Sequence, residues 1–197
     1  KFDGFRSQVH KDGDNVRIFS RNLEDITHFM PEIVEEVKKL PYEKLIFDSE
    51  ALTYDEDTNT LYPFQITIQR KRKHNIEEVS EQYPLRLFAF DVMLINDEDL
   101  LNEPYIKRRE KLEKLFKENM RISRSNIIIT DDPKEFEKFF DLTIGAGLEG
   151  IVAKKLDAPY SAGARNFNWI KMKRSYKSQL SDTIDVVILG YFKGRGL

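Results

Sequence analysis

Apolar and polar residues alternate with a period of two in several stretches of the chain, which is the pattern of half-buried β-strands. Strands are predicted over residues 5–10, 16–21, 44–54, 85–95, 127–130, 149–155, 168–174 and 184–192. A polar turn separates the first two strands, and Gly13 in that turn is free to adopt a positive φ. These two strands are therefore expected to form a hairpin.

Three helices are indicated by apolar residues that recur three or four positions apart. They are predicted over residues 31–40, 105–117 and 133–144. Pro31 suits the first turn of the first helix, and Asp131 or Asp132 is placed to cap the third. Because helices and strands do not alternate in a βαβ rhythm, the order predicts an α+β fold with mostly antiparallel sheets.

The composition is that of a globular chain with one substantial core. The chain has 197 residues, of which 40% are hydrophobic and 34% are charged. No apolar run approaches the roughly 20 residues that a membrane-spanning helix needs, so no membrane partner is expected. The sequence has no cysteine, which excludes disulfides and thiolate metal sites and fits an intracellular protein.

The net charge of −2 limits how the chain could hold a nucleic acid. A protein that binds DNA by neutralising phosphates is normally basic, so binding would depend on a local patch or on another domain. The longest cationic run is Arg70-Lys71-Arg72-Lys73. It is either a solvated loop or helix end, or a phosphate contact, and the sequence leaves both readings open.

Candidate chemistry is concentrated in five short blocks. The chain opens with Lys1-Phe2-Asp3-Gly4-Phe5-Arg6, and the later blocks are FDSEA at 47–51, LFAFD at 87–91, EGIVAK at 149–154 and WIKMK at 169–173. In this order they resemble the motif series of the covalent nucleotidyltransferases, which include ATP-dependent DNA ligases, RNA ligases and mRNA capping enzymes. The chain is most similar, over essentially its whole length, to the adenylation domain of archaeal and eukaryotic ATP-dependent DNA ligases.

The resemblance implies both a fold and a reaction. The fold would contain two mostly antiparallel sheets flanked by helices, with the nucleotide site between them, as in an ATP-grasp-like nucleotidyltransferase core. Lys1 would attack the α-phosphate of ATP to form enzyme–AMP. The AMP would then pass to the 5′-phosphate of nicked DNA, and the nick would be sealed during DNA replication, repair and recombination.

The resemblance also assigns roles to individual residues. Arg6 and Arg21 match nucleotide and sugar contacts, Phe90 matches an aromatic that stacks on the purine, and Arg165, Lys171 and Lys173 match phosphate contacts. Glu50 matches an acid that binds the ribose or organises a metal, and Glu149 matches a carboxylate of the metal site. Two carboxylates together with substrate phosphates form an oxygen-ligand site that suits Mg²⁺.

Elementary chemistry allows these roles and also allows structural alternatives. A free lysine has a pKa of about 10.4, so Lys1 must lose a proton before it attacks, and nearby cations would lower that pKa. Alternation places Asp48 and Glu50 on one strand face, and it places Phe88 and Phe90 on one face. A phenylalanine in an apolar strand usually belongs to the core, and the sequence leaves open which of the two would reach a base.

Residues 1–183 are expected to form an adenylation domain that lacks its extreme N-terminus, and residues 184–197 to lead into an OB-fold domain. By resemblance, a DNA-binding domain would precede the chain. The implied partners are nicked double-stranded DNA, these two flanking domains and a sliding clamp. The expected location is the cytoplasm for an archaeal protein and the nucleus for a eukaryotic one.

Two other functions remain open from the sequence. One is RNA ligation or mRNA capping, and a capping guanylyltransferase would use GTP. The other is a non-catalytic nucleotide- or DNA-binding module, against which the intact Lys1 argues. One departure from the family pattern is Ser49, which stands where the family often has glycine. Serine is still small enough to allow close backbone approach.

Overall fold

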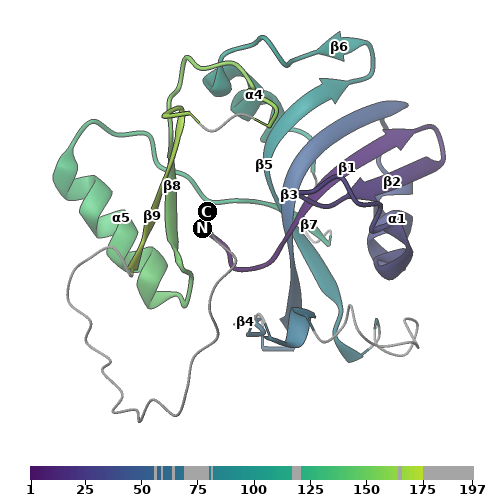
Figure 1. The fold of residues 1–197 in the computed structure, drawn as a ribbon, viewed down its shortest axis with the longest axis horizontal. Helices are drawn as coiled ribbons and strands as arrows, with labels where there is room; N and C mark the ends of the chain where they lie inside the picture. Colours follow the sequence, from purple (N-terminus) through teal and green to yellow (C-terminus); the bar gives the residue numbers. More distant parts are fainter. Residues whose placement is uncertain are drawn as a thin grey trace, which may run out of the picture.

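A large curled sheet and a small two-stranded sheet stand on either side of the N-terminal segment in the computed structural model of the chain (Figure 1). The structure describes residues 1–55, 57–58, 60–63, 65–68, 80, 82–116, 121–163 and 166–174. Within this part of the chain the strands pair antiparallel except for one parallel pair, β5 with β7. The predicted α+β class is confirmed.

The large sheet has the strand order β2-β1-β3-β5-β6, with β4 paired to β3 and β7 paired to β5. Its strands are β1 (Phe5–Asp12), β2 (Asn15–Phe19), β3 (Lys44–Asp55), β4 (Thr60–Leu61), β5 (Leu85–Ile95), β6 (Glu98–Asp99) and β7 (Ile122–Arg124). The predicted hairpin is present, and Gly13 in its turn has a φ of +56°. The long strands β3 and β5 form the centre of the sheet.

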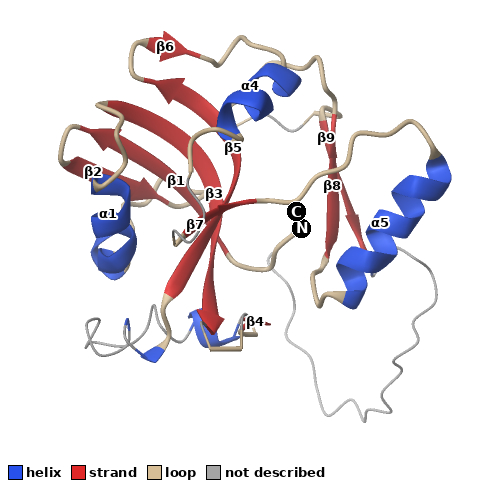
Figure 2. Cartoon of the chain, turned by 180° about the vertical axis from the view of Figure 1, so that it is seen from behind, coloured by secondary structure: helices blue, strands red, loops and turns tan. Residues whose placement is uncertain are grey.

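The small sheet consists of β8 (Gly150–Lys154) and β9 (Trp169–Lys173), and α5 (Pro133–Gly145) lies beside it (Figure 2). Asp132, one of the two predicted caps, accepts a hydrogen bond from the Lys134 backbone N–H at 2.9 Å. Gly150 has a φ of +147°, and a Cβ at this position would overlap the Met172 carbonyl oxygen. The Glu-Gly pair that opens the EGIVAK block therefore needs its glycine for close strand pairing.

The main core lies on one face of the large sheet. Val9, Ile18, Phe47 and Leu87 are fully buried at alternate positions of β1, β2, β3 and β5. They pack with residues of the 3₁₀ helix η1 (Thr27–Phe29), of α1 (Pro31–Lys38) and of α4 (Tyr105–Leu112). Each large apolar side chain buried here contributes about 1.5–3 kcal/mol. The other face of the sheet is left free for polar side chains.

Two of the predicted elements differ in the structure. The prediction of a strand over residues 127–130 is wrong, because residues 125–130 form no strand. The strand in this region is β7, which ends at Arg124. The run Ile127, Ile128 and Ile129 has β-branched residues but no partner strand, and these side chains are 38–57% exposed. The helix expected over 105–117 ends at Leu112.

The strand predicted over 184–192 and the cationic run at 70–73 lie outside the described residues. Among the helices that the structure describes, none is both long and apolar enough to span a membrane.

Candidate active site

Lys1 lies where the N-terminal segment meets the small sheet. The Glu149 backbone N–H donates to the Lys1 carbonyl oxygen at 3.1 Å, and the Lys1 ammonium forms an ion pair with the Glu149 carboxylate. Lys173 approaches the other oxygen of Glu149 at 3.4 Å. Partial burial works to raise the pKa of Glu149, but the hydrogen bond and charge of Lys1, followed by Lys173, hold it below its usual value.

Gly4 is needed because the chain passes very close to β3 at this point. A Cβ on Gly4 would lie 2.5 Å from the Ala51 carbonyl oxygen and 2.8 Å from Leu52 Cγ. The Gly4 backbone N–H also donates a hydrogen bond to the Glu50 carboxylate. Gly4 thus allows the segment that carries Lys1 to pass close to β3.

Gly4→Ala is expected to lower the free energy of unfolding by about 1–3 kcal/mol, because the new methyl group has no space. It should also displace Lys1 and the Glu50 carboxylate from each other. Gly145→Ala is a matched control, since a Cβ at Gly145 meets nothing within 4 Å. Urea unfolding of both variants checks this, and equal stability of the two would contradict the close approach.

The polar face of the large sheet carries a row of three side chains across three strands. Arg6 on β1 is directly opposite Glu50 on β3, and Glu50 is directly opposite Phe88 on β5. Burial raises the pKa of Glu50, and the positive charges of Lys1 and Arg6 work against that rise. Glu50 is therefore a desolvated carboxylate that faces two cations.

A β-bulge in β5 gives its two aromatic residues, Phe88 and Phe90, different pairing with β3. Asp91 is opposite Asp48, and the register then shifts so that Ala89 is opposite Ser49, which leaves Phe90 without a directly opposed residue on β3. Phe88 stacks on Phe2, with ring centroids 4.4 Å apart. Phe90 instead lies among the groups of the site, with its ring centroid 5.0 Å from the Arg6 guanidinium carbon.

Arg6 is held firmly by its neighbours. Both oxygens of the buried Asp48 accept hydrogen bonds from its guanidinium group. The Tyr160 hydroxyl donates to Asp48 at 2.6 Å, and Gln8 donates to Asp48 at 3.2 Å. Because Tyr160 comes from the loop between β8 and β9, this carboxylate joins the two sheets.

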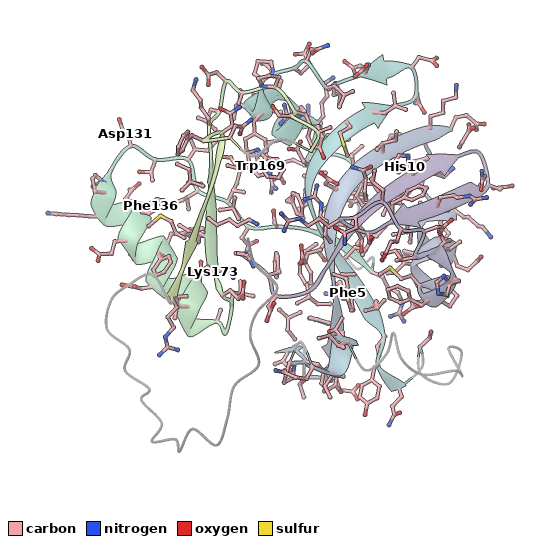
Figure 3. All side chains as sticks on the ribbon, viewed as in Figure 1. Phe5, His10, Asp131, Phe136, Trp169 and Lys173 are labelled. Atoms are coloured by element: carbon pink, nitrogen blue, oxygen red, sulfur yellow. The ribbon has the colours of Figure 1, made fainter. Side chains whose placement is uncertain are left out.

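The cations of the site influence one another. Lys171 has a lowered pKa, first because of partial burial and then because of the charges of Arg21, Lys1 and Lys173. Arg21 lies in the turn after β2, where the Ser20 hydroxyl oxygen accepts the N–H groups of the turn. Figure 3 shows Trp169 and Lys173 at the two ends of β9. Since Lys171 is the middle residue of β9, it shares a strand face with both.

The structure thus brings together most of the residues singled out from the sequence: Lys1, Arg6, Arg21, Glu50, Phe90, Glu149, Lys171 and Lys173. Arg165 lies outside the described residues. Sequence reasoning missed Tyr160 and the buried pair Asp91–Arg108. Sequence spacing contains no signal for Tyr160, because its partner Asp48 is 112 positions away.

The oxygen donors of the site fit a magnesium ion that shares its ligands with a substrate. In the part of the chain that the structure describes, no group of three or more His, Cys, Asp or Glu residues could hold a metal unaided. Glu50 and Glu149 each lie close enough to Lys1 to interact with its charge. Two carboxylates completed by phosphate oxygens and water suit Mg²⁺.

A lysine, two carboxylates and several cations between the two β-sheets form a site whose chemistry suits covalent nucleotide transfer. The chain belongs to the ATP-dependent DNA ligase domain family. The model of this family, described as "ATP dependent DNA ligase domain", matches residues 1–173. It is 59% identical to a "Probable DNA ligase" of Dictyoglomus turgidum and 44% identical to a "DNA ligase" of Sulfophobococcus zilligii. All of this chain is covered in both comparisons, but only 34% and 33% of the two relatives.

Solved structures agree with the family. The ligase domain of M. tuberculosis LigD matches with a TM-score of 0.68 and 25% identity, over 88% of this chain and 52% of that chain. The Chlorella virus DNA ligase-adenylate matches with a TM-score of 0.59 over 88% of this chain and 63% of that chain. At 17% identity, the second likeness supports the fold alone. The chain spans about a third of the length of the curated relatives it matches.

Proposed function

We propose that this chain carries out the nucleotide-transfer chemistry of an ATP-dependent DNA ligase, with Lys1 as the nucleophile. The observation that carries this proposal is the position of Lys1 beside Glu149, which also pairs with Lys173, and near Lys171, in a chain that belongs to the ligase domain family. Mycobacterial DNA ligase D, a structural neighbour at 25% identity, has been solved in complex with ATP.

In the first step the Lys1 Nζ attacks the α-phosphorus of ATP. A nitrogen–phosphorus bond forms, the bond between the α-phosphorus and the bridging oxygen breaks, and pyrophosphate leaves. The amine attacks in its uncharged form, so its proton passes to solvent before the bond forms. The charges of Lys171 and Lys173 would stabilise the negative charge that develops on the phosphate.

The remaining residues hold the substrate. Phe90 would stack on the purine, while Arg6, fixed by Asp48, and Arg21 would contact the nucleotide. Glu50 and Glu149 would hold Mg²⁺, which neutralises phosphate charge when it is bound. The chain itself would then pass AMP from Lys1 to the 5′-phosphate of a nick, and the 3′-hydroxyl would displace AMP and seal the strand.

The rest of the protein would contribute to DNA binding. With a net charge of −2, this chain would need help from flanking DNA-binding and OB-fold domains to hold nicked DNA. Arg165, which lies outside the described residues, would add a further phosphate contact. Recruitment by a sliding clamp and a cytoplasmic location in an archaeal cell complete the proposal.

The direct test of the function is nick sealing by the full-length protein. ATP or GTP labelled in the α-phosphate is supplied with Mg²⁺ and a nicked DNA or RNA duplex. We expect AMP transfer to the 5′-phosphate and sealing of DNA with ATP. Transfer of GMP would instead support a capping enzyme, sealing of RNA alone would support an RNA ligase, and ATP binding without a covalent adduct would support a binding module.

A further inference from the structure

Lys154 is a buried lysine that the proposed reaction does not use. It ends β8, and its side chain is only 9% exposed. Its ammonium donates a hydrogen bond to the Phe90 carbonyl oxygen at 3.1 Å. The ammonium also lies over three aromatic rings, 4.0 Å from the centre of Trp169, 4.3 Å from Tyr105 and 4.9 Å from Phe90.

The hydrogen bond joins the small sheet to the large sheet at the β5 bulge. Phe90 is the residue that the bulge leaves without a direct partner on β3, so the neighbouring strand does not fix its position. Lys154 contacts both the carbonyl group and the ring of Phe90. It therefore replaces the constraint that a regular strand pairing would have supplied.

The ion pair with Asp91 does not explain why a lysine is needed here. Lys154 is 3.6 Å from Asp91, but Arg108 already donates two hydrogen bonds to that carboxylate, at 2.7 and 3.1 Å. Both Asp91 and Arg108 are fully buried. The carboxylate thus keeps a bidentate partner without Lys154. Lys154 instead donates the shorter of the two side-chain hydrogen bonds to the Phe90 carbonyl oxygen, at 3.1 Å against 3.5 Å from the Tyr105 hydroxyl.

The charges around Lys154 come from every element packed against it. Asp91 on β5 and Asp48 on β3 are negative, whereas Arg6 on β1 and Arg108 on α4 are positive. The hydroxyl groups of Tyr105 and Tyr160 face the same cluster. Burial is the largest cause that lowers the pKa of Lys154, to about 8, with the two arginines adding to it and the two aspartates opposing it. Burial of this charged ammonium costs free energy, and ionisable groups buried in this way are typical of functional sites.

We propose that Lys154 is a positioning residue that holds Phe90 in place for stacking on the purine. This inference deepens the proposed function and rests on the role of Phe90 in that function. The charged form of Lys154 makes the contacts, since an ammonium donates to the carbonyl group and is attracted to the aromatic rings.

The first test uses the fluorescence of Trp169, which is the one tryptophan of the sequence. Because the Lys154 ammonium lies over that ring, we expect the emission to change with pH, with a midpoint of about 8. Lys154→Met should remove this transition. Lys155→Met is the matched control, because Lys155 pairs with Asp157 at the surface and should leave the transition unchanged. A transition that persists in Lys154→Met would overturn the placement of the ammonium.

The second test measures ATP affinity in the full-length protein. Lys154→Met is expected to weaken ATP binding about tenfold, the low end of the loss of a base-stacking contact. The rate of adduct formation at saturating ATP should stay within about twofold, since Lys154 does not touch the reacting atoms, and Lys154→Arg should restore part of the affinity. From pH 7 to pH 9 the affinity of the wild type should fall as Lys154 loses its proton, and the Met variant should lose this component.

The outcomes separate this inference from the proposed function. If the wild type forms the AMP adduct but Lys154→Met binds ATP equally well at every pH, the inference fails and the proposed function stands. If the wild type binds no ATP, both fail. A purely structural role would instead lower the midpoint of thermal unfolding, whereas replacing a buried ammonium with methionine is expected to leave it unchanged or raise it.

Discussion

Lys1→Arg is expected to abolish formation of the enzyme–AMP adduct. Arginine keeps the positive charge next to Glu149, but its guanidinium group cannot be deprotonated in a protein and so cannot attack phosphorus. The rate should fall by at least about 10⁴-fold, the scale seen when a covalent nucleophile is removed. Incorporation of label from ATP labelled in the α-phosphate into the full-length protein measures this rate.

The same variant also separates the steps of the reaction. Sealing of a nick that already carries AMP on its 5′-phosphate requires no lysine nucleophile, so Lys1→Arg should retain much more of this activity. Lys155→Arg is the control for a cation change at an exposed position, and it should leave both steps intact. Adduct formation at the wild-type rate in Lys1→Arg would remove Lys1 from the role of nucleophile.

Lys171→Ala is expected to slow lysine–AMP formation by about 10²–10³-fold, the usual loss when one preorganised donor to a transition-state oxygen is removed. Lys171 is the middle residue of β9, and its lowered pKa shows that it shares a positive field with Arg21, Lys1 and Lys173. Its removal would therefore take away stabilisation of the negative charge that develops on the phosphate. Single-turnover measurements of adduct formation at saturating ATP check this prediction.

Met172→Ala is the matched control for Lys171→Ala, because Met172 is adjacent on β9 and lies on the opposite strand face. Met172 is 37% exposed, so its truncation should cost little stability. An unchanged rate in Lys171→Ala would place Lys171 outside the site. Equal losses in the two variants would indicate general damage to β9.

The sequence predicted most of the site because its residues lie on strands, where alternation determines which side chains share a face. Arg6 and Glu50 fall on the polar face of neighbouring strands, and the structure places them directly opposite each other. Lys171 and Lys173 likewise share one face of β9. The roles of these residues rest on the family resemblance, and spacing alone would not have assigned them.

Other parts of the site depend on contacts that no local pattern encodes. The bulge at Phe90 arises from the pairing of β3 with β5, and the alternation of the sequence gives no sign of it. The bonds from Tyr160 to Asp48 and from Lys154 to the Phe90 carbonyl join the two sheets across 112 and 64 positions. Such contacts are decided by how the sheets pack.

The strand that was wrongly predicted over residues 127–130 has a related cause. Isoleucine has a high β-propensity, but a strand forms only where a neighbour offers a free edge. The parallel pairing of β7 with β5 extends to Arg124, and the Ser125 N–H donates to the Ala89 carbonyl oxygen at its end. The three isoleucines that follow lie beyond this pairing.

The measurement that tests the central claim most directly is the mass of the full-length protein after incubation with ATP and Mg²⁺, followed by peptide mapping. We expect one AMP per chain, attached to Lys1 through an acid-labile nitrogen–phosphorus bond and released as ATP when pyrophosphate is added. An adduct on another lysine, such as Lys171 or Lys173, or the absence of any adduct in a protein that binds ATP, would contradict Lys1 as the nucleophile.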